Sequence, residues 1–189
     1  MQNISKEKSI LNMDNEIEIK TFDGNLEALR DLLRSAWVPD YSEHKQSVIN
    51  FALSYLKWNL QNSLSNSYFH IGAYHNDKLV GFAASFPQKY EYVSRTGNGL
   101  TKRQISGVLS TFFTTHNEYR RKGLGTMLAK ERIRRHIEQG VEINLFYQDH
   151  GHASSKVYPK FSGYLKSSYS NLTTVNFLIK VLDIKKCAN

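Results

Sequence analysis

The segment Arg120-Arg121-Lys122-Gly123-Leu124-Gly125-Thr126 places three cations directly before two glycines, where a helical hydrophobic pattern begins. The first amides of a helix have no intrahelical partners, and the positive end of the helix dipole adds to their attraction for anions. Glycine lets a phosphate approach the backbone without interference from a Cβ atom. The segment therefore indicates either a cradle for a polyanion or a basic, solvent-exposed helix start.

The spacing excludes two familiar phosphate loops. A Walker A loop ends in Gly-Lys-Ser/Thr, whereas Lys122 precedes both glycines. A dinucleotide-binding fingerprint requires a third glycine or an alanine where Leu128 stands. Taken alone, a Gly-x-Gly pattern is weak evidence for an anion site, so the solvent-exposed helix start is slightly favoured.

The charge of the chain is concentrated around this segment. The 189 residues carry a net charge of +8, with a pI near 9.5, which favours an acidic or phosphate-bearing partner. Residues 120–135 contribute +6, from seven cations and one glutamate. The later arginines recur once per helical turn, which is typical of a solvated helix face, so we expect them on the surface. No aromatic interleaving or helix-turn-helix pattern supports DNA or RNA binding, and we expect no nucleic-acid partner.

Composition favours one globular domain, residues 16–189, after a flexible extension, residues 1–15, that shows no periodicity. The lone Cys187 excludes a disulfide framework and a cysteine-based metal site. The N-terminus carries charges and amides where a signal peptide needs an apolar core, and no apolar run approaches the ~18 residues of a membrane span. We expect a soluble cytoplasmic protein without membrane contact.

Hydrophobic periodicity predicts the elements that must position the glycine segment. A strand at 16–20 precedes a helix at 26–36, which ends before Pro39 and has Asp23 or Asn25 as its N-cap, and a second helix at 48–60. Strands at 68–74 and 79–86 form a hairpin, and Pro87 interrupts the second strand. Segment 88–106 either extends this hairpin or forms a loop.

The remaining elements complete an α/β sandwich around a mixed sheet. A buried strand at 108–115 leads into the glycine segment, and a helix runs from Leu124 to a stop at Gly140. A strand at 142–146, a short helix from Ala153 and a strand at 176–182 follow.

In this context, Arg120–Thr126 resembles the acetyl-coenzyme A loop of the GNAT (GCN5-related N-acetyltransferase) superfamily, whose pattern is Gln/Arg-x-x-Gly-x-Gly/Ala. Residues 115–119 are similar to the family's lead-in, with Asn117 where a proline is common. The segment Ala153…Tyr158-Pro159-Lys160-Phe161-Ser162-Gly163-Tyr164 is similar to the family's A…Y-x-K…G-F/Y segment. Gly163 follows Tyr158 one residue later than the commonest spacing in the family. Gly151 stands seven residues before Tyr158, where many members have an asparagine. The element order also matches, so the resemblance covers residues 16–182 and implies a mostly antiparallel central sheet flanked by helices.

The resemblance implies an acetyl-coenzyme A-dependent N-acetyltransferase without a metal. Such an enzyme moves an acetyl group to a primary amine of a small molecule or a peptide by direct attack in a ternary complex. The loop would hold the pyrophosphate, the pantetheine would run along a splayed strand, and a backbone N–H of that strand would stabilise the thioester oxygen. The implied cofactor-binding residues are Phe113, Thr114, Thr115, Arg120, Arg121, Lys122, Gly123, Leu124, Gly125 and Thr126.

Tyr158 matches the family's tyrosine and is the predicted acid that protonates the leaving thiolate, as a phenol with a pKa near 10 can do at neutral pH. The sequence does not identify the general base. Residues 109–115 contain no carboxylate, which leaves a water chain or one of Glu91, His116, Asp149 and His150.

Two alternatives remain beside the enzyme. The missing carboxylate in the strand keeps open a non-catalytic GNAT-like module that senses acyl-coenzyme A or binds a protein, and a basic nucleic-acid-binding domain is a weaker third reading. The acceptor would be contacted by residues 26–60 and 88–106, and a homodimer is compatible with the sequence. The aromatic candidates for an acceptor cleft, each also explained by packing, are Trp37, Tyr41, Trp58, Tyr90 and Tyr92.

Overall fold

The computed structural model describes residues 17–43, 50–62, 65–96 and 99–147, all of which belong to one compact unit, Met1–Tyr147. Residues 148–189 form the second unit of the chain and lie outside the described residues. Tyr158 and the elements predicted at 153 and at 176–182 fall there, as does the N-terminal extension at the other end. The single-domain assignment therefore stays a prediction.

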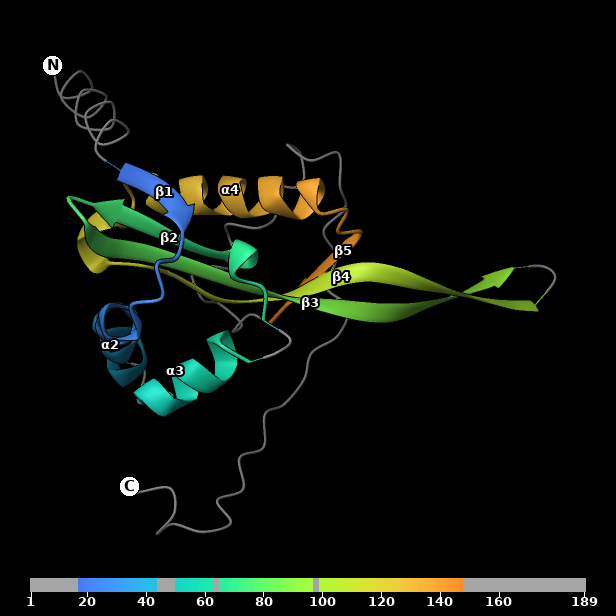
Figure 1. Cartoon of the computed structure of the whole chain (residues 1–189), viewed down its shortest axis with the longest axis horizontal. Helices are drawn as coiled ribbons and strands as arrows, with labels where there is room; N and C mark the ends of the chain where they lie inside the picture. Colours follow the sequence, from blue (N-terminus) through green and yellow to red (C-terminus); the bar gives the residue numbers. More distant parts are fainter. Residues whose placement is uncertain (1–16, 44–49, 63–64, 97–98, 148–189) are drawn as a thin grey trace, which may run out of the picture. The chain divides into compact units, whose positions relative to one another are not determined.

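A five-stranded sheet forms the centre of the described unit (Figure 1). Its strands follow one another in sequence order, and all neighbours are antiparallel except β4 and β5, which are parallel. The strands are β1 (Ile17–Thr21), β2 (His70–His75), β3 (Lys78–Thr96), β4 (Gly99–Thr115) and β5 (Ile143–Phe146). The predicted fold class, a mixed and mostly antiparallel sheet flanked by helices, is confirmed.

Helices cover both faces of this sheet. Figure 1 shows α2 (Leu26–Glu43) and α3 (Leu53–Leu60) on one face and α4 (Leu124–Glu138) on the other. Burial of each large apolar side chain between these layers contributes about 1.5–3 kcal/mol. The fully buried side chains include Leu29, Leu33, Phe51, Leu56 and Phe82 under α2 and α3, and Ile71, Val80, Leu124 and Leu128 under α4.

Helix α2 begins where the sequence predicted and ends later. Asn25 caps it, because its Oδ1 accepts from the Ala28 amide at 3.0 Å. The prediction that the helix ends before Pro39 is wrong, since α2 continues to Glu43 with Pro39 inside it. A proline in a helix leaves the carbonyl four residues earlier, here that of Ser35, without its intrahelical donor. Asn117 supplies a replacement, because its Nδ2 donates to the Ser35 oxygen at 3.0 Å.

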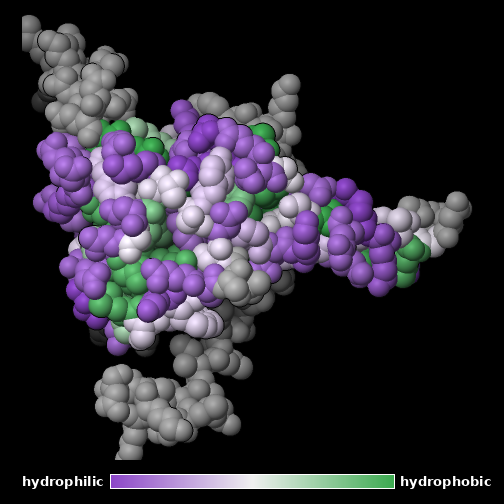
Figure 2. Space-filling view, in the orientation of Figure 1, coloured by the Kyte–Doolittle hydropathy of each residue, from purple (hydrophilic) through white to green (hydrophobic). Residues whose placement is uncertain are grey.

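Residues 88–96 and 99–106 belong to paired strands rather than to a loop. Strands β3 and β4 stay paired as far as Thr96 and Gly99, and Figure 1 shows this two-stranded arm projecting from the sheet. Pro87 does not interrupt β3, because it pairs with Val108. The β2–β3 pairing ends at Ala84, so Pro87 lies where β3 is an edge strand and its missing N–H removes no ladder bond. Figure 2 shows the arm covered mainly by hydrophilic residues.

Among the described residues, no helix has both the length and the apolar composition needed to cross a lipid bilayer.

Candidate active site

Strand β4 carries a bulge at Phe112, three residues before its end at Thr115. Phe82 pairs with Thr114 and Ala84 with Thr111, so two residues of β4 lie opposite Ala83 alone. Phe112, one of the two, has a φ of 52°, a left-handed conformation that is uncommon for a bulky residue. A bulge leaves backbone groups outside the regular ladder and redirects the strand. Such strain is concentrated at functional sites, so the end of β4 is a candidate for ligand contact.

The same end of β4 also extends past its other neighbour. Pairing with β5 begins at Gly107 and ends where Ser110 meets Phe146. The described β4–β5 pairing thus ends before Phe113–Thr115, the residues predicted to bind pantetheine, and their binding of a ligand stays a prediction.

Side chains at the end of β4 alternate between the two helical layers. Phe112 is buried on the α2–α3 side, with its ring 6.4 Å from the rings of Tyr55 and Phe82. Thr114 lies on the same side, where its Oγ1 accepts from Trp37 Nε1 at 3.0 Å. Phe113 packs on the α4 side against the buried cluster that includes Leu124 and Leu128.

The glycine segment forms an open helix start beside this strand. A short 3-10 turn (Asn117–Tyr119) leads to Gly123, whose φ of 92° favours glycine. The first α4 amide bonded back to the segment is that of Met127, which donates to the Gly123 oxygen at 3.0 Å, and no described side chain caps the helix. The amides of Leu124, Gly125 and Thr126 therefore sit at an uncapped N-terminus.

Gly125 brings the helix start against the strand. A Cβ atom built on Gly125 would lie 3.9 Å from Thr115 Cγ2 and 4.0 Å from Phe113 Cε1. The structure thus brings together the two groups of residues that the resemblance assigned to one cofactor.

The three cations of the segment differ in their surroundings. Arg120 is committed to α2, because its guanidinium binds Asp40 through two hydrogen bonds, of 3.0 and 2.8 Å, and donates to the Ala36 oxygen at 2.8 Å. Arg121 is exposed and has a φ of 62°. Lys122 is also exposed, and its Nζ lies 5.9 Å from the centre of the Tyr119 ring. Arg121 and Lys122 are thus the side chains placed to meet an anion from solvent.

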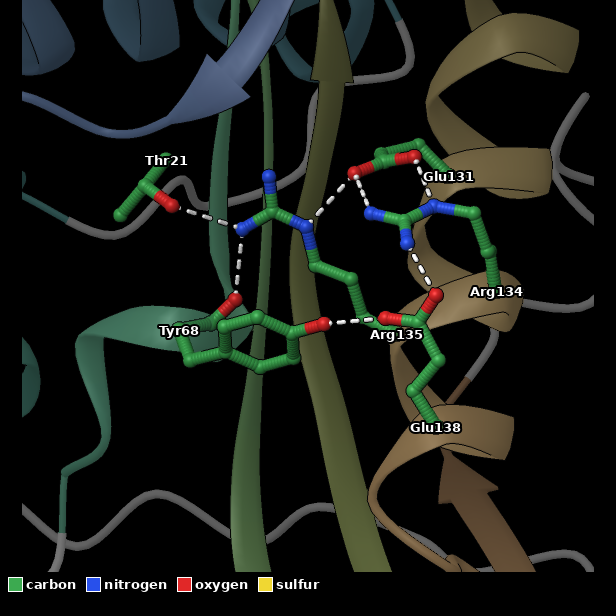
Figure 3. A network of polar contacts seen from close by, with 6 residues as sticks. All are labelled: Thr21, Tyr68, Glu131, Arg134, Arg135 and Glu138. Carbon is green, nitrogen blue, oxygen red and sulfur yellow. Dashed lines mark hydrogen bonds and ion pairs between the residues drawn. The ribbon is translucent and has the colours of Figure 1, made fainter.

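The expectation that the later arginines are surface residues is wrong for Arg132 and Arg135, which are 1% and 5% exposed. Arg135 Nη1 donates to Thr21 Oγ1 at 2.9 Å and to the Tyr68 carbonyl oxygen at 2.7 Å, and its Nε donates to Glu131 at 2.7 Å (Figure 3). Arg135 therefore ties α4 to the end of β1 and to the turn before β2. A helical pattern counts an arginine as solvated, but it does not reveal acceptors supplied by distant segments.

Arg132 and His136 are also buried, with 1% and 5% of their surface exposed. The Arg132 guanidinium lies 4.9 Å from the centre of the Phe113 ring, which places a cation directly behind the bulge of β4. Burial, with the charge of Arg132 as a smaller cause, lowers the pKa of His136 to about 3.

The candidates for the general base are dispersed. His116 Nδ1 accepts from the Glu118 amide at 3.4 Å and so begins the 3-10 turn, while Glu91 pairs with Lys102 on the arm. Asp149 and His150 lie outside the described residues.

The aromatic candidates for an acceptor cleft divide into two kinds. Trp37 stacks on Tyr41 with ring centres 6.1 Å apart and is held by Thr114, whereas Trp58 and Tyr92 are exposed and Tyr90 is half-buried.

Sequence reasoning missed two features of this region. The pairing of Asp40 with Arg120 joins residues 80 positions apart, and nothing in the local pattern indicates it. The bulge at Phe112 also has no local signal, because the surrounding residues read as an uninterrupted strand.

Comparisons with known proteins identify the family of the chain. Residues 1–150 match the family model "Myristoyl-CoA:protein N-myristoyltransferase, N-terminal domain". A search of curated proteins gives no match.

Among solved structures, a GCN5-related N-acetyltransferase from Kribbella flavida is 14% identical, with a TM-score of 0.57 over 77% of this chain and 32% of that one. An aminoglycoside acetyltransferase from an uncultured soil metagenomic sample, in complex with sisomicin, is 15% identical, with a TM-score of 0.55 over 89% of this chain and 99% of that one. The N-myristoyltransferase of Saccharomyces cerevisiae with bound myristoyl-CoA is 21% identical, with a TM-score of 0.52 over 69% of this chain.

The chain spans only 28% of that yeast enzyme, and at these identities the structural likeness concerns the fold. The family assignment rests on the model that matches residues 1–150. The chain belongs to the family of the N-terminal domain of myristoyl-CoA:protein N-myristoyltransferase, an acyltransferase family with the GNAT fold that the glycine segment predicted.

Proposed function

We propose that the chain transfers an acetyl group from acetyl-coenzyme A to a primary amine of a small molecule or a peptide. The observation that carries this proposal is the closeness of Gly125 to Phe113 and Thr115, whose side chains would lie 4.0 and 3.9 Å from a Cβ atom on Gly125. It places an uncapped helix N-terminus beside a bulged strand end. A cofactor with a pyrophosphate at one end and an amide-bearing arm at the other fits such a pair of surfaces.

The pyrophosphate is assigned to the helix start. The amides of residues 121–126 and the exposed side chains of Arg121 and Lys122 supply charge-assisted donors without rearrangement of the core. Gly123 and Gly125 keep the approach open, because a Cβ on either would meet nothing closer than 3.9 Å. Thr126 is exposed in the first turn, whereas Leu124 anchors that turn in the core.

The pantetheine is assigned to residues 113–115 of β4, which follow the bulge and lie beyond Ser110, the last β4 residue that pairs with β5 in the described part of the chain. In the reaction, the amine nitrogen attacks the thioester carbonyl, a C–N bond forms and the C–S bond breaks. A backbone N–H at the bulge stabilises the oxygen as negative charge develops on it. The amine loses one proton to a base, and Tyr158 returns one to the departing thiolate.

The acceptor is assigned to the α2–α3 side of the site and to the arm. Trp58 and Tyr92 are exposed there, and they are aromatic surfaces that an acceptor could cover. We propose that the transferred group is acetyl. The alternative is a longer acyl chain, such as the myristoyl group bound by the yeast enzyme, and the relative affinities for the two thioesters distinguish them.

Calorimetric titration with acetyl-coenzyme A, myristoyl-coenzyme A and pantetheine tests the proposal. We expect acetyl-coenzyme A to bind, and pantetheine, which lacks the pyrophosphate, to bind much more weakly. At 100 times the Kd, the ligand should raise the stability by about 2.7 kcal/mol. Absence of binding by both thioesters contradicts the proposal, and preference for the myristoyl thioester contradicts the acetyl assignment.

Turnover is tested separately by release of free thiol across a panel of primary amines. Thiol release that depends on the amine supports an enzyme. Tight binding without thiol release from any amine favours the non-catalytic sensor, which the absence of a carboxylate in residues 109–115 keeps open.

A further inference from the structure

We propose that Asp40 is a positioning residue for the acyl-coenzyme A loop, and that Arg120 orders this loop instead of contacting phosphate. The inference rests on the proposed function, because it concerns the same site. It reassigns the first residue of the loop motif, and it gives a role to an aspartate that no motif includes.

Three hydrogen bonds hold the Arg120 guanidinium within the protein. Nη1 donates to Asp40 Oδ1 at 3.0 Å, and Nη2 donates to Asp40 Oδ2 at 2.8 Å, which is the two-pronged geometry that suits a guanidinium and a carboxylate. Nη2 also donates to the Ala36 oxygen at 2.8 Å, and the Arg120 amide donates to the Asn117 oxygen at 3.2 Å. A phosphate would have to displace Asp40 before it could take the two-pronged face of the Arg120 guanidinium.

Helix α2 is built to receive the loop at this point. Pro39 has no N–H, so the Ser35 carbonyl lacks its usual intrahelical donor and accepts from Asn117 instead. The next carbonyl, that of Ala36, accepts from Arg120. The turn of α2 that contains the proline therefore presents two carbonyls and the Asp40 carboxylate to residues 117–120.

The same turn of α2 holds the other half of the site. Trp37 Nε1 donates to Thr114 Oγ1 at 3.0 Å, and Thr114 lies next to the bulge of β4. Residues 35–40 thus fix the strand end through Trp37 and the loop through Asp40. We infer that this turn sets the spacing between the pantetheine strand and the pyrophosphate loop.

Removal of the Asp40 charge should change the affinity for the cofactor in opposite directions, depending on whether Asp40 acts through its charge or by positioning the loop. Asp40 is a negative charge close to a site for a polyanion, so its removal should strengthen phosphate binding if it acts only through its charge. If Arg120 were a phosphate ligand held back by Asp40, its release would add to that gain. If Asp40 positions the loop, its removal should weaken binding in spite of the favourable change in charge.

The experiment compares Asp40→Asn with Asp31→Asn by calorimetric titration with acetyl-coenzyme A. Asp31 lies on the same helix and pairs with Arg30 at 3.0 Å, so the control repeats the chemical change at an exposed ion pair away from the loop. We expect Asp40→Asn to raise the Kd about 5-fold, the effect of losing a favourable, partly exposed ion pair. Asp31→Asn should leave the Kd unchanged.

Two further variants separate positioning from charge and from folding. Arg120→Lys keeps the cation but loses the two-pronged contact, so it should weaken binding as Asp40→Asn does, whereas a phosphate-binding cation would tolerate lysine better. The double variant Asp40→Asn/Arg120→Gln should bind acetyl-coenzyme A no more weakly than the weaker-binding of Asp40→Asn and Arg120→Gln alone, because both substitutions break the same contact. If the Asp40–Arg120 contact served only stability, these variants would have a lower Tm, and the Kd of the folded protein would be unchanged.

Tighter or unchanged binding by Asp40→Asn overturns the inference and leaves the proposed function standing. Absence of binding by the unaltered protein overturns the proposed function, and the inference with it.

Discussion

His136 Nε2 lies 3.0 Å from Ser85 Oγ, between α4 and the sheet. Ser85 in turn lies 2.9 Å from Ser110 Oγ, and Ser110 donates to Asn144 Oδ1 at 2.7 Å. A hydroxyl has one proton, so Ser110 must accept from Ser85, and Ser85 must accept from His136. His136 therefore carries a proton on Nε2, and because burial lowers its pKa to about 3 it is a neutral imidazole at neutral pH.

This arrangement predicts that the protein loses stability as the pH falls. Burial lowers the pKa of His136 to about 3 and that of His70 to about 4, both below the ordinary value of about 6.5. Above pH 6.5 both histidines are neutral in either state, so their contribution to stability is complete. As the pH falls toward 4, the unfolded chain binds protons that the folded chain excludes. At pH 5 each histidine should cost about 2 kcal/mol.

Urea denaturation between pH 7.5 and 5 measures this loss. His136→Gln keeps a side-chain N–H donor but cannot titrate, so its free energy of unfolding should depend less on pH than that of the unaltered protein. His70→Gln should act in the same way, and the double variant should lose most of the dependence. An unchanged slope in the double variant would show that other groups drive acid unfolding.

The neighbouring Arg134 and Arg135 predict a contrast in stability. Both bind Glu131, but Arg135 is buried and also holds Thr21 and the Tyr68 carbonyl, whereas Arg134 is exposed (Figure 3). Arg135→Met leaves those acceptors without a donor and should lower the free energy of unfolding by about 3 kcal/mol. Arg134→Met should have little effect, because an exposed ion pair adds little net stability. Equal losses in urea denaturation would contradict a structural role for burial of Arg135.

The sequence predicted the part of the fold that depends on local pattern. Alternation identified β1, and the helical period and Gly140 identified α4 and its end. The errors lie where a distant segment supplies a partner. Pro39 stays inside a helix because Asn117 satisfies the carbonyl that it frees, and Pro87 stays in a strand because β2 has already ended.

The residues of the candidate site also fall into those with a local sequence pattern and those held by distant partners. The loop and the strand end were predicted from the family resemblance, which rests on a local pattern of glycines and cations before a helix. The contribution of α2 was not, since Trp37 and Asp40 act through hydrogen bonds to Thr114 and Arg120, more than 70 residues away. A pattern along one sequence does not contain that pairing.

Arg121 is predicted to contribute directly to cofactor affinity. It is exposed at the helix start, and unlike Arg120 it is not held by α2. Arg121→Ala should raise the Kd for acetyl-coenzyme A about 10-fold through loss of a charge-assisted contact. The difference should shrink in high salt, because solvent-exposed charges are screened.

Arg95→Ala is the matched control, since Arg95 is an exposed arginine near the end of the arm. Titration at two salt concentrations distinguishes the sites. Equal effects of the two substitutions would indicate that only the overall charge of the protein attracts the cofactor, without a defined contact at the loop.

Tyr158 is predicted to affect turnover rather than binding. Tyr158→Phe removes the phenolic proton and keeps the ring, so the leaving thiolate loses its acid while the contacts that hold the cofactor persist. Loss of a general acid should lower kcat about 100-fold and change the Kd for acetyl-coenzyme A little. Tyr147→Phe, at an exposed tyrosine beyond β5, should leave both constants unchanged. Thiol-release kinetics beside calorimetric titration measures the two quantities, and an unchanged kcat would assign protonation of the thiolate to water or to another side chain.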